Sequence, residues 1–118
     1  MTVQKQVSMI QEKEVAKKLG GKVTPASGGT KFDGGDVVVN DLLLECKTVT
    51  KDQTSFSVKK EWLDKVKEQS FEQGCDLSAL AFRFGPNQLD YVVIDIDTFN
   101  ELLSAYYKEL QRELEGEQ

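Results

Sequence analysis

The feature that most constrains the fold is a pair of short apolar runs joined by two polar residues. Residues 37–39 are three valines, residues 42–44 are three leucines, and Asn40-Asp41 lies between them. Asparagine and aspartate both tolerate the left-handed backbone that a two-residue β-turn requires. The sequence therefore predicts a tight β-hairpin whose strands are apolar enough to be at least half buried.

Charged side chains meet at the open end of this hairpin. With a two-residue turn Asp36 faces Glu45, and strand alternation puts Lys47 on the same side as Glu45. Two carboxylates that face each other across a sheet repel. A hard divalent cation such as Mg²⁺ takes oxygen ligands and removes this repulsion. The alternative is a hairpin that ends in solvent, with Glu45 and Lys47 as a surface ion pair.

A further acid lies on the expected first helix, over residues 3–19. Glu12 falls in the middle of an apolar stripe, where an acid is costly unless it is paired or coordinated. The alternative is a frayed helix that turns Glu12 outward. A second apolar strip, Val3, Val7 and Ile10, is available to a partner subunit or to the C-terminal helix. The stripe around Glu12 consists of Met9, Val15, Ala16 and Leu19.

A glycine-rich loop over residues 25–35 leads into the hairpin, after a short strand expected at 22–24. The hydroxyls of Ser27 and Thr30 and the exposed glycine amides are suited to hold a phosphate. The loop lacks the Gly-Lys-Ser/Thr order of a Walker loop. A plain surface loop is the alternative.

The next helix is expected over residues 58–73, with Ser57 as its N-cap. Lys51, Lys59 and Lys60 lie before it or in its first turn. Lysines at a helix start oppose the helix dipole, which points to a phosphate partner. A solvated charged turn is the alternative. The apolar side of this helix is expected to contain Val58, Trp62, Val66 and Phe71.

Two further strands, over 77–84 and 91–96, precede a last helix. That helix is expected to start at the capping box formed by Thr98 and Glu101, and the acidic tail at 112–118 is expected to fray. The order αβββαββα predicts one α/β domain over the whole chain, with a mixed central β-sheet flanked by helices. The apolar stripe of the last helix is Phe99, Leu102, Leu103, Tyr106 and Leu110.

Charge is distributed unevenly along the chain. Residues 1–67 hold 12 Lys/Arg and 9 Asp/Glu, a net of +3, whereas residues 68–118 hold 3 and 11, a net of −8. A polyanion is therefore expected to bind the first half. The absence of histidine excludes His-based catalytic triads. Two cysteines without zinc spacing, no apolar run long enough to span a membrane and no signal peptide favour a cytoplasmic protein.

This set of motifs resembles the PD-(D/E)XK nuclease superfamily, and more closely the archaeal-type Holliday-junction resolvases and their phage relatives. The resemblance covers roughly residues 8–96. It implies a restriction-endonuclease-like fold and, for a phage-encoded chain, the host cytoplasm as its location. The motifs that carry it are the helix around Glu12, the loop Ser27-Gly-Gly-Thr30, Gly35-Asp36, Glu45-Cys46-Lys47, Thr50-Lys51 and the strand over 79–84.

The resemblance also implies a division of roles within the site. Glu12, Asp36 and Glu45 are expected to bind Mg²⁺, for which Mn²⁺ can substitute. Lys47 is expected to orient the attacking water and to stabilise charge on the phosphate. A loop hydroxyl, from Ser27 or Thr30, is expected near the scissile phosphate.

The implied reaction is hydrolysis of DNA at a four-way junction. A junction is two-fold symmetric and needs paired cuts, so a homodimer is expected. Two alternatives are open: a PD-(D/E)XK endonuclease for flaps, nicks or duplex DNA, and a non-catalytic nucleic-acid-binding module with the same fold. The residues expected to contact the DNA backbone are Lys31, Lys51, Lys59 and Lys60.

Overall fold

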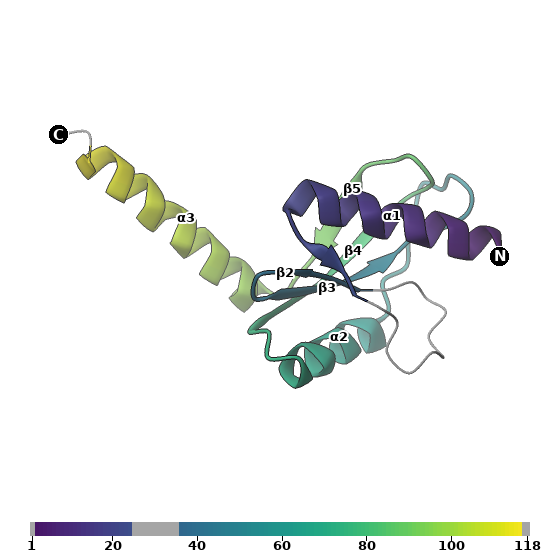
Figure 1. Cartoon of the computed structure of the whole chain (residues 1–118), viewed down its shortest axis with the longest axis horizontal. Helices are drawn as coiled ribbons and strands as arrows, with labels where there is room; N and C mark the ends of the chain where they lie inside the picture. The colour runs from purple at the N-terminus through teal and green to yellow at the C-terminus, as the bar shows by residue number, and fades with distance from the viewer. Residues whose placement is uncertain (1, 25–35, 117–118) are drawn as a thin grey trace.

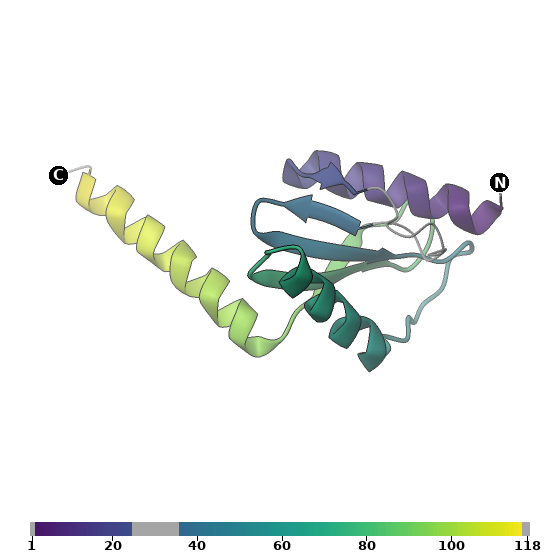
Figure 2. The ribbon, with the colours of Figure 1, turned by 60° about the horizontal axis from the view of Figure 1, so that its bottom comes forward.

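A five-stranded mixed sheet forms the centre of the molecule, with α1 and α2 on its opposite faces (Figures 1 and 2). The computed structural model describes residues 2–24 and 36–116. The order αβββαββα and the mixed sheet are as predicted, and they agree with a restriction-endonuclease-like arrangement. The elements are α1 (Val3–Leu19), β1 (Lys22–Val23), β2 (Asp36–Val39), β3 (Leu42–Lys47), α2 (Lys60–Glu72), β4 (Leu77–Arg83), β5 (Asp90–Val93) and α3 (Ile96–Gly116).

The strands follow the order β1-β2-β3-β4-β5, with β3 and β4 parallel and the other pairs antiparallel. A parallel pair needs a crossover, and α2 supplies it between β3 and β4. Because β3 is the middle strand and helices cover both faces of the sheet, five of its six residues, from Leu43 to Lys47, are buried. Charged residues at its end are therefore forced into the interior.

The first helix begins and ends where its capping residues predict. The hydroxyl of Thr2 accepts a hydrogen bond from the backbone N–H of Lys5, and Gly20 ends the helix with φ +72°. Val15 and Ala16 of α1 pack on the sheet, as the apolar stripe predicts. Their buried neighbours on this face of the sheet are Val37, Leu44, Cys46, Ala79 and Ala81. Met9 and Leu19 of the same predicted stripe are exposed, because the buried face of α1 runs through Ser8 and Gln11 instead.

Helix α2 is shorter than predicted, and Ser57 is not its cap. Lys59 occupies the N-cap position and makes no side-chain capping bond. The ring of Phe56 stacks on Phe82 of β4 at 4.8 Å between centroids, and residues 48–59 form no helix. The prediction for Phe71 was also wrong, because the buried face of α2 runs through Val66 and Ser70 and leaves Phe71 exposed.

The end of the chain differs most from expectation. Strand β5 ends at Val93 instead of continuing to residue 96, and α3 begins at Ile96. The carboxylate of Asp95 accepts a hydrogen bond from the backbone N–H of Thr98 at 2.7 Å, so Asp95, not Thr98, caps this helix. The tail was expected to fray from residue 112, but α3 is helical as far as Gly116.

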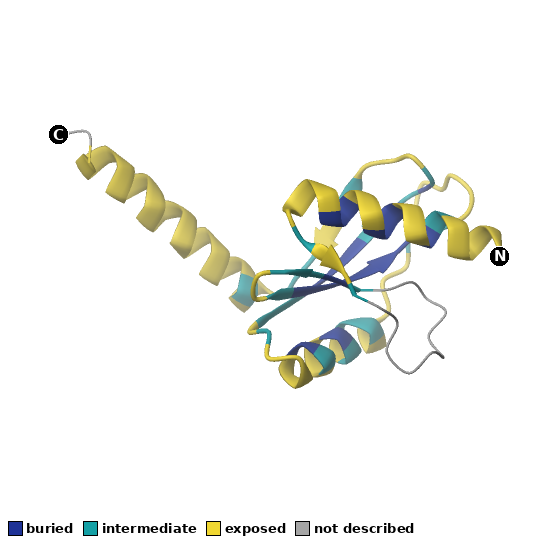
Figure 3. Ribbon diagram, viewed as in Figure 1, coloured by how far each residue is buried: buried dark blue, intermediate teal, exposed yellow. Residues whose placement is uncertain are grey.

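The sheet is flanked by α1 and α2, whereas helix α3 does not cover it (Figure 3). Helix α3 projects away from the body of the molecule, and none of its residues is buried (Figure 3). The molecule is elongated as a result, with extents of 56 × 31 × 24 Å. Within residues 2–24 and 36–116 no helix is long and apolar enough to cross a membrane.

Candidate functional site

The β2–β3 hairpin has the predicted register. Asp36 is the partner of Glu45, and Asn40 in the turn has φ +51°. The backbone of Asp36 is held from the other side, because its carbonyl accepts hydrogen bonds from the N–H and the hydroxyl of Thr24 at 2.8 and 3.1 Å. Partners across a sheet share a face, so the side chains of Asp36 and Glu45 point to the same side.

Glu45 and Lys47 form a buried ion pair on that face. Lys47 Nζ lies 3.5 Å from Glu45 Oε1, and the two side chains are 9% and 7% exposed. The second carboxylate oxygen, Oε2, is buried and has no hydrogen-bond partner among the described residues. A buried carboxylate oxygen without a partner is costly. This oxygen is therefore a candidate ligand atom for a cation.

Lys47 also lies against aromatic rings. Its Nζ is 4.6 Å from the centroid of the Trp62 ring, and Nζ of Lys59 is 5.5 Å from the same centroid. Both distances are within the range of cation–π attraction. Behind Trp62 lies a cluster of rings at centroid distances of 4.8 to 6.1 Å, formed by Phe56, Phe82, Phe84 and Tyr91.

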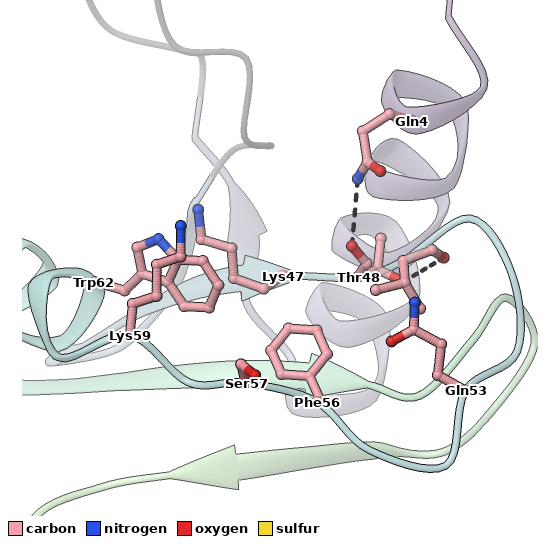
Figure 4. A pocket seen from close by; sticks show the side chains of 9 residues that line it. Gln4, Lys47, Thr48, Gln53, Phe56, Ser57, Lys59 and Trp62 are labelled. Carbon is pink, nitrogen blue, oxygen red and sulfur yellow. Dashed lines mark hydrogen bonds between the residues drawn. The ribbon is translucent and has the colours of Figure 1, made fainter.

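An open pocket of about 680 Å³ lies beside Lys47. Figure 4 shows the ammonium groups of Lys47 and Lys59 pointing the same way next to Trp62, with Phe56 between these groups and the amide of Gln53. The pocket thus has a cationic end, an aromatic wall and an amide end. The sequence had indicated the lysines, but nothing in it indicated the pocket, because its walls come from segments far apart in the chain.

A hydrogen-bond network that the sequence did not predict binds the backbone of β3 from the α1 face of the sheet. Gln11 is fully buried, and its Nε2 donates to the carbonyl of Lys47 at 2.8 Å and to Asp90 Oδ1 at 3.0 Å. Asp90 also accepts from the buried guanidinium of Arg83, which in turn donates to Glu14 at 3.1 Å. The backbone at the catalytic candidate Lys47 is therefore tied to both α1 and β5.

Glu12 is buried, as its place in the apolar stripe predicted. It lies close enough to Cys46 to affect that thiol. Burial is the largest cause of a strongly raised pKa at Cys46, and the charges of Glu12, Asp90 and Asp36 raise it further. Side chains alternate along β3. The thiol of Cys46 therefore points to the α1 face, and the side chains of Glu45 and Lys47 point to the α2 face.

The metal site stays a prediction. Among residues 2–24 and 36–116, no group of three or more His, Cys, Asp or Glu side chains is arranged to hold a metal ion. Mg²⁺ is commonly bound through only one or two carboxylates, together with water and substrate phosphate. Asp36 and Glu45, on one face, supply two such carboxylates.

The other predicted site residues fall into two groups. Ser27, Thr30 and Lys31 lie outside the described residues. Lys51, Lys59 and Lys60 are exposed, as expected for contacts to a DNA backbone. Lys60 also forms a surface ion pair with Asp64 at 2.9 Å, whereas Lys59 lies at the pocket.

Fold and site together define an α/β domain with a buried Glu-x-Lys pair that opens on a mixed cationic and aromatic pocket. Comparison with protein-family models, curated proteins and solved structures finds no match.

Proposed function

We propose that the protein is a metal-dependent, structure-selective DNA endonuclease that resolves four-way junctions by paired phosphodiester hydrolysis. The observation that carries the proposal is the buried pair Glu45–Lys47, with Asp36 opposite and an open pocket alongside. A buried ion pair is weak evidence for a structural role, because replacing it with apolar residues is often neutral or stabilising. A role in chemistry gives a reason to keep it.

Asp36 and Glu45 fit a divalent cation of the hard class, Mg²⁺ or Mn²⁺. Both are oxygen donors on one face, and Glu45 Oε2 lacks a hydrogen-bond partner among the described residues. Glu12, the third acid of the predicted set, is buried on α1, on the face of the sheet opposite the Glu45 side chain, so the proposed ligand pair is Asp36 and Glu45. A bound cation of this class lowers the pKa of a water and offsets negative charge on the phosphate.

Lys47 is the proposed partner of the phosphate. Its ammonium is held between the Glu45 carboxylate and the Trp62 ring, so it is positioned before DNA arrives. A preorganised cation in a partly dehydrated site stabilises developing negative charge better than one in open water. Lys47 therefore donates hydrogen bonds to the scissile phosphate and orients the attacking water, while the Trp62 ring excludes solvent from one side.

Backbone phosphates on either side are assigned to exposed lysines. Lys51 and Lys59 are the main candidates, because Lys60 is already paired with Asp64. Lys31 completes the proposed set. Such contacts position the duplex without reading its sequence, and they make binding strongly salt-dependent.

Paired cleavage requires two sites, and α3 is the proposed means of dimerisation. Its apolar stripe lies in water in the single chain. Residues 96–116 carry a net charge of −3, whereas residues 3–19 of α1 carry +2 and expose Val3 and Ile10. This complementarity favours α3 of one copy packing on α1 of the second copy, and the reverse, as two-fold symmetry requires.

Cleavage of a labelled four-way junction and of the matching linear duplex, with Mg²⁺ and with EDTA, tests the proposal. The wild-type protein is expected to make paired symmetric cuts in the junction only. Asp36→Asn and Glu45→Gln are expected to lower the rate by at least about 100-fold while leaving junction binding intact. Glu61→Gln, an exposed acid on α2, is the matched control.

Other results separate the alternatives. Equal cutting of both substrates supports a nuclease for flaps, nicks or duplex DNA and rejects junction selection. Binding of the junction without cleavage in Mg²⁺ supports the non-catalytic module. Full activity of Asp36→Asn or Glu45→Gln overturns the assignment of the site.

A further inference from the structure

The cationic end of the pocket is suited to an anion. Lys47 and Lys59 lie beside the same Trp62 ring, so their ammonium groups are no further apart than the sum of 4.6 and 5.5 Å. Glu45 lies within ion-pair distance of Lys47, whereas no carboxylate among the described residues forms an ion pair with Lys59. A phosphate near both lysines would give the Lys59 ammonium an anionic partner.

The middle of the pocket is aromatic and rigid. Phe56 contributes to its wall, and the back of this ring is stacked on Phe82, which itself contacts Phe84 and Tyr91. A ring that is held in this way presents a flat apolar surface at little cost in conformational entropy. Nucleobases stack on such surfaces whatever their identity, because every base has a π-face.

The far end of the pocket carries amide groups. Gln53 and Gln4 line it, and their side chains hold both donors and acceptors. The segment that carries Gln53 is anchored to the sheet, because its backbone N–H donates to the carbonyl of Phe84 at 2.8 Å. Close contact with Asp52 also leaves no room for a Cβ at Gly85, so the segment sits tightly on the end of β4.

We propose that this pocket binds one unpaired nucleotide, with its phosphate at Lys47 and Lys59, its base on Phe56 and the base edge at Gln53. The volume, about 680 Å³, is within the range of about 300–1,000 Å³ typical of small-ligand sites. A base still paired in a duplex has its edge occupied and its faces stacked, so only an unpaired one can enter.

The inference deepens the proposed function and rests on it for its biological meaning. Lys47 belongs both to the pocket and to the proposed catalytic pair. A nucleotide in the pocket therefore places its own phosphate beside that pair. All bases of a four-way junction are paired, so a nucleotide can enter the pocket there only if a base pair at the branch point opens. Selection of branched DNA then follows if such a pair opens more readily than one inside a continuous duplex, in addition to the shape of a dimer.

Trp62 is the only tryptophan in the chain, so its fluorescence reports on this pocket alone. The experiment titrates the full-length protein in EDTA with a short oligothymidylate, a blunt duplex, and the same duplex with one internal unpaired thymidine. The oligothymidylate and the interrupted duplex are expected to quench Trp62 saturably. The blunt duplex is expected to bind with at least about 10-fold lower affinity in the same titration, since it offers no free base to stack.

Two variants and one control test the assignment. Phe56→Leu keeps an apolar side chain but removes the stacking surface, and is expected to weaken oligothymidylate binding by about 10-fold or more. Lys59→Gln is expected to weaken it several-fold and to reduce its salt dependence. Lys67→Gln is the matched control, because Lys67 is an exposed lysine of α2 that lies near Asp95 and does not line the pocket.

Because EDTA prevents metal-dependent cleavage, this titration measures DNA binding alone. The pocket proposal and the nuclease proposal can therefore be rejected independently. Quenching that depends on Phe56 and Lys59 supports the pocket even if no DNA is cut, and in that case only the nuclease proposal falls. Equal quenching by all three DNAs overturns the pocket, as does unchanged binding by both Phe56→Leu and Lys59→Gln. If either of these results is found and the protein still cleaves junctions in Mg²⁺, only the pocket proposal is rejected and the nuclease proposal is retained.

Discussion

Strand β3 buries charged side chains, whereas helix α3 exposes large apolar ones. In β3 the charged residues Glu45 and Lys47 are only 5% and 8% exposed. In α3 the large apolar side chains of Tyr106 and Leu114 are 59% and 65% exposed. Each arrangement is unfavourable for an isolated chain, because buried charges lose hydration and exposed apolar groups order water.

The two regions differ in the kind of contact that would remove the unfavourable free energy. At β3 the unfavourable group is a carboxylate oxygen without a partner, which a small cation or a hydrogen-bond donor satisfies. On α3 it is a continuous stripe on a helix of 21 residues, which only a surface of similar length covers. The proposed functions of the two regions, chemistry at β3 and assembly through α3, follow from this difference.

The largest expected effect concerns the buried pair. Lys47→Met leaves Glu45 buried without its ammonium partner and is expected to lower the free energy of unfolding by about 3 kcal/mol. Urea denaturation measures it. Lys60→Met is the control, because its pair with Asp64 is largely exposed and is expected to contribute less than about 0.5 kcal/mol. Equal effects of the two variants would show that β3 is not a special environment.

The assembly surface is tested by charge introduced into the apolar stripe. Leu103→Glu is expected to weaken dimerisation at least about 100-fold, as for a central interface residue. Light scattering after gel filtration measures the mass over a range of concentrations. Ser104→Glu adds the same charge outside the apolar stripe, about 100° around α3 from Leu103, and should leave the dimer intact. A wild-type protein that is monomeric at every concentration rejects the proposed role of α3.

A smaller effect is expected at the network behind β3. Gln11→Leu removes the hydrogen bonds to Lys47 and Asp90 and is expected to cost about 2 kcal/mol, since it leaves a buried carbonyl without its donor. Gln4→Leu provides a control, because Gln4 is exposed and makes longer bonds of 3.2 and 3.4 Å. If both variants unfold at the same urea concentration, Gln11 does not hold the β3 backbone.

Local patterns were enough to predict much of the body. The bounds of α1 followed from an apolar stripe and a terminal glycine, and the pairing of Asp36 with Glu45 followed from the length of one turn. Both depend on residues close together in the chain. The network of Gln11, Arg83 and Asp90 could not be found in this way, because its members come from α1, β4 and β5 and meet only once the sheet has formed.

The position of α3 was not predictable for a different reason. An apolar stripe on a helix indicates that it is covered, but not whether the cover belongs to the same chain or to another. The capping error has a similar origin. Asp95 and Thr98 both precede an apolar run by the right spacing, and strand β5 decides between them by ending at Val93.

The smallest expected effect is a pH dependence at the start of α3. The N–H of Thr98 donates to the Asp95 carboxylate and lowers the pKa of Asp95 below its ordinary value of 3.8. A lowered folded-state pKa means that the stabilisation is complete above the ordinary pKa and is lost as the pH falls through the lowered one. Asp95→Ala removes the cap at every pH.

Circular dichroism at neutral and acidic pH therefore compares wild type with Asp95→Ala. Wild type is expected to have more helix than the variant near neutral pH, and the difference should shrink below about pH 4, where the carboxylate begins to be protonated. Asp97→Ala, also acidic and in the first turn of α3, is the control. Because no residue of α3 is buried within the single chain, a lost cap is expected to show as lost helix. A difference that does not change with pH would mean that the ionised carboxylate of Asp95 does not hold the start of α3.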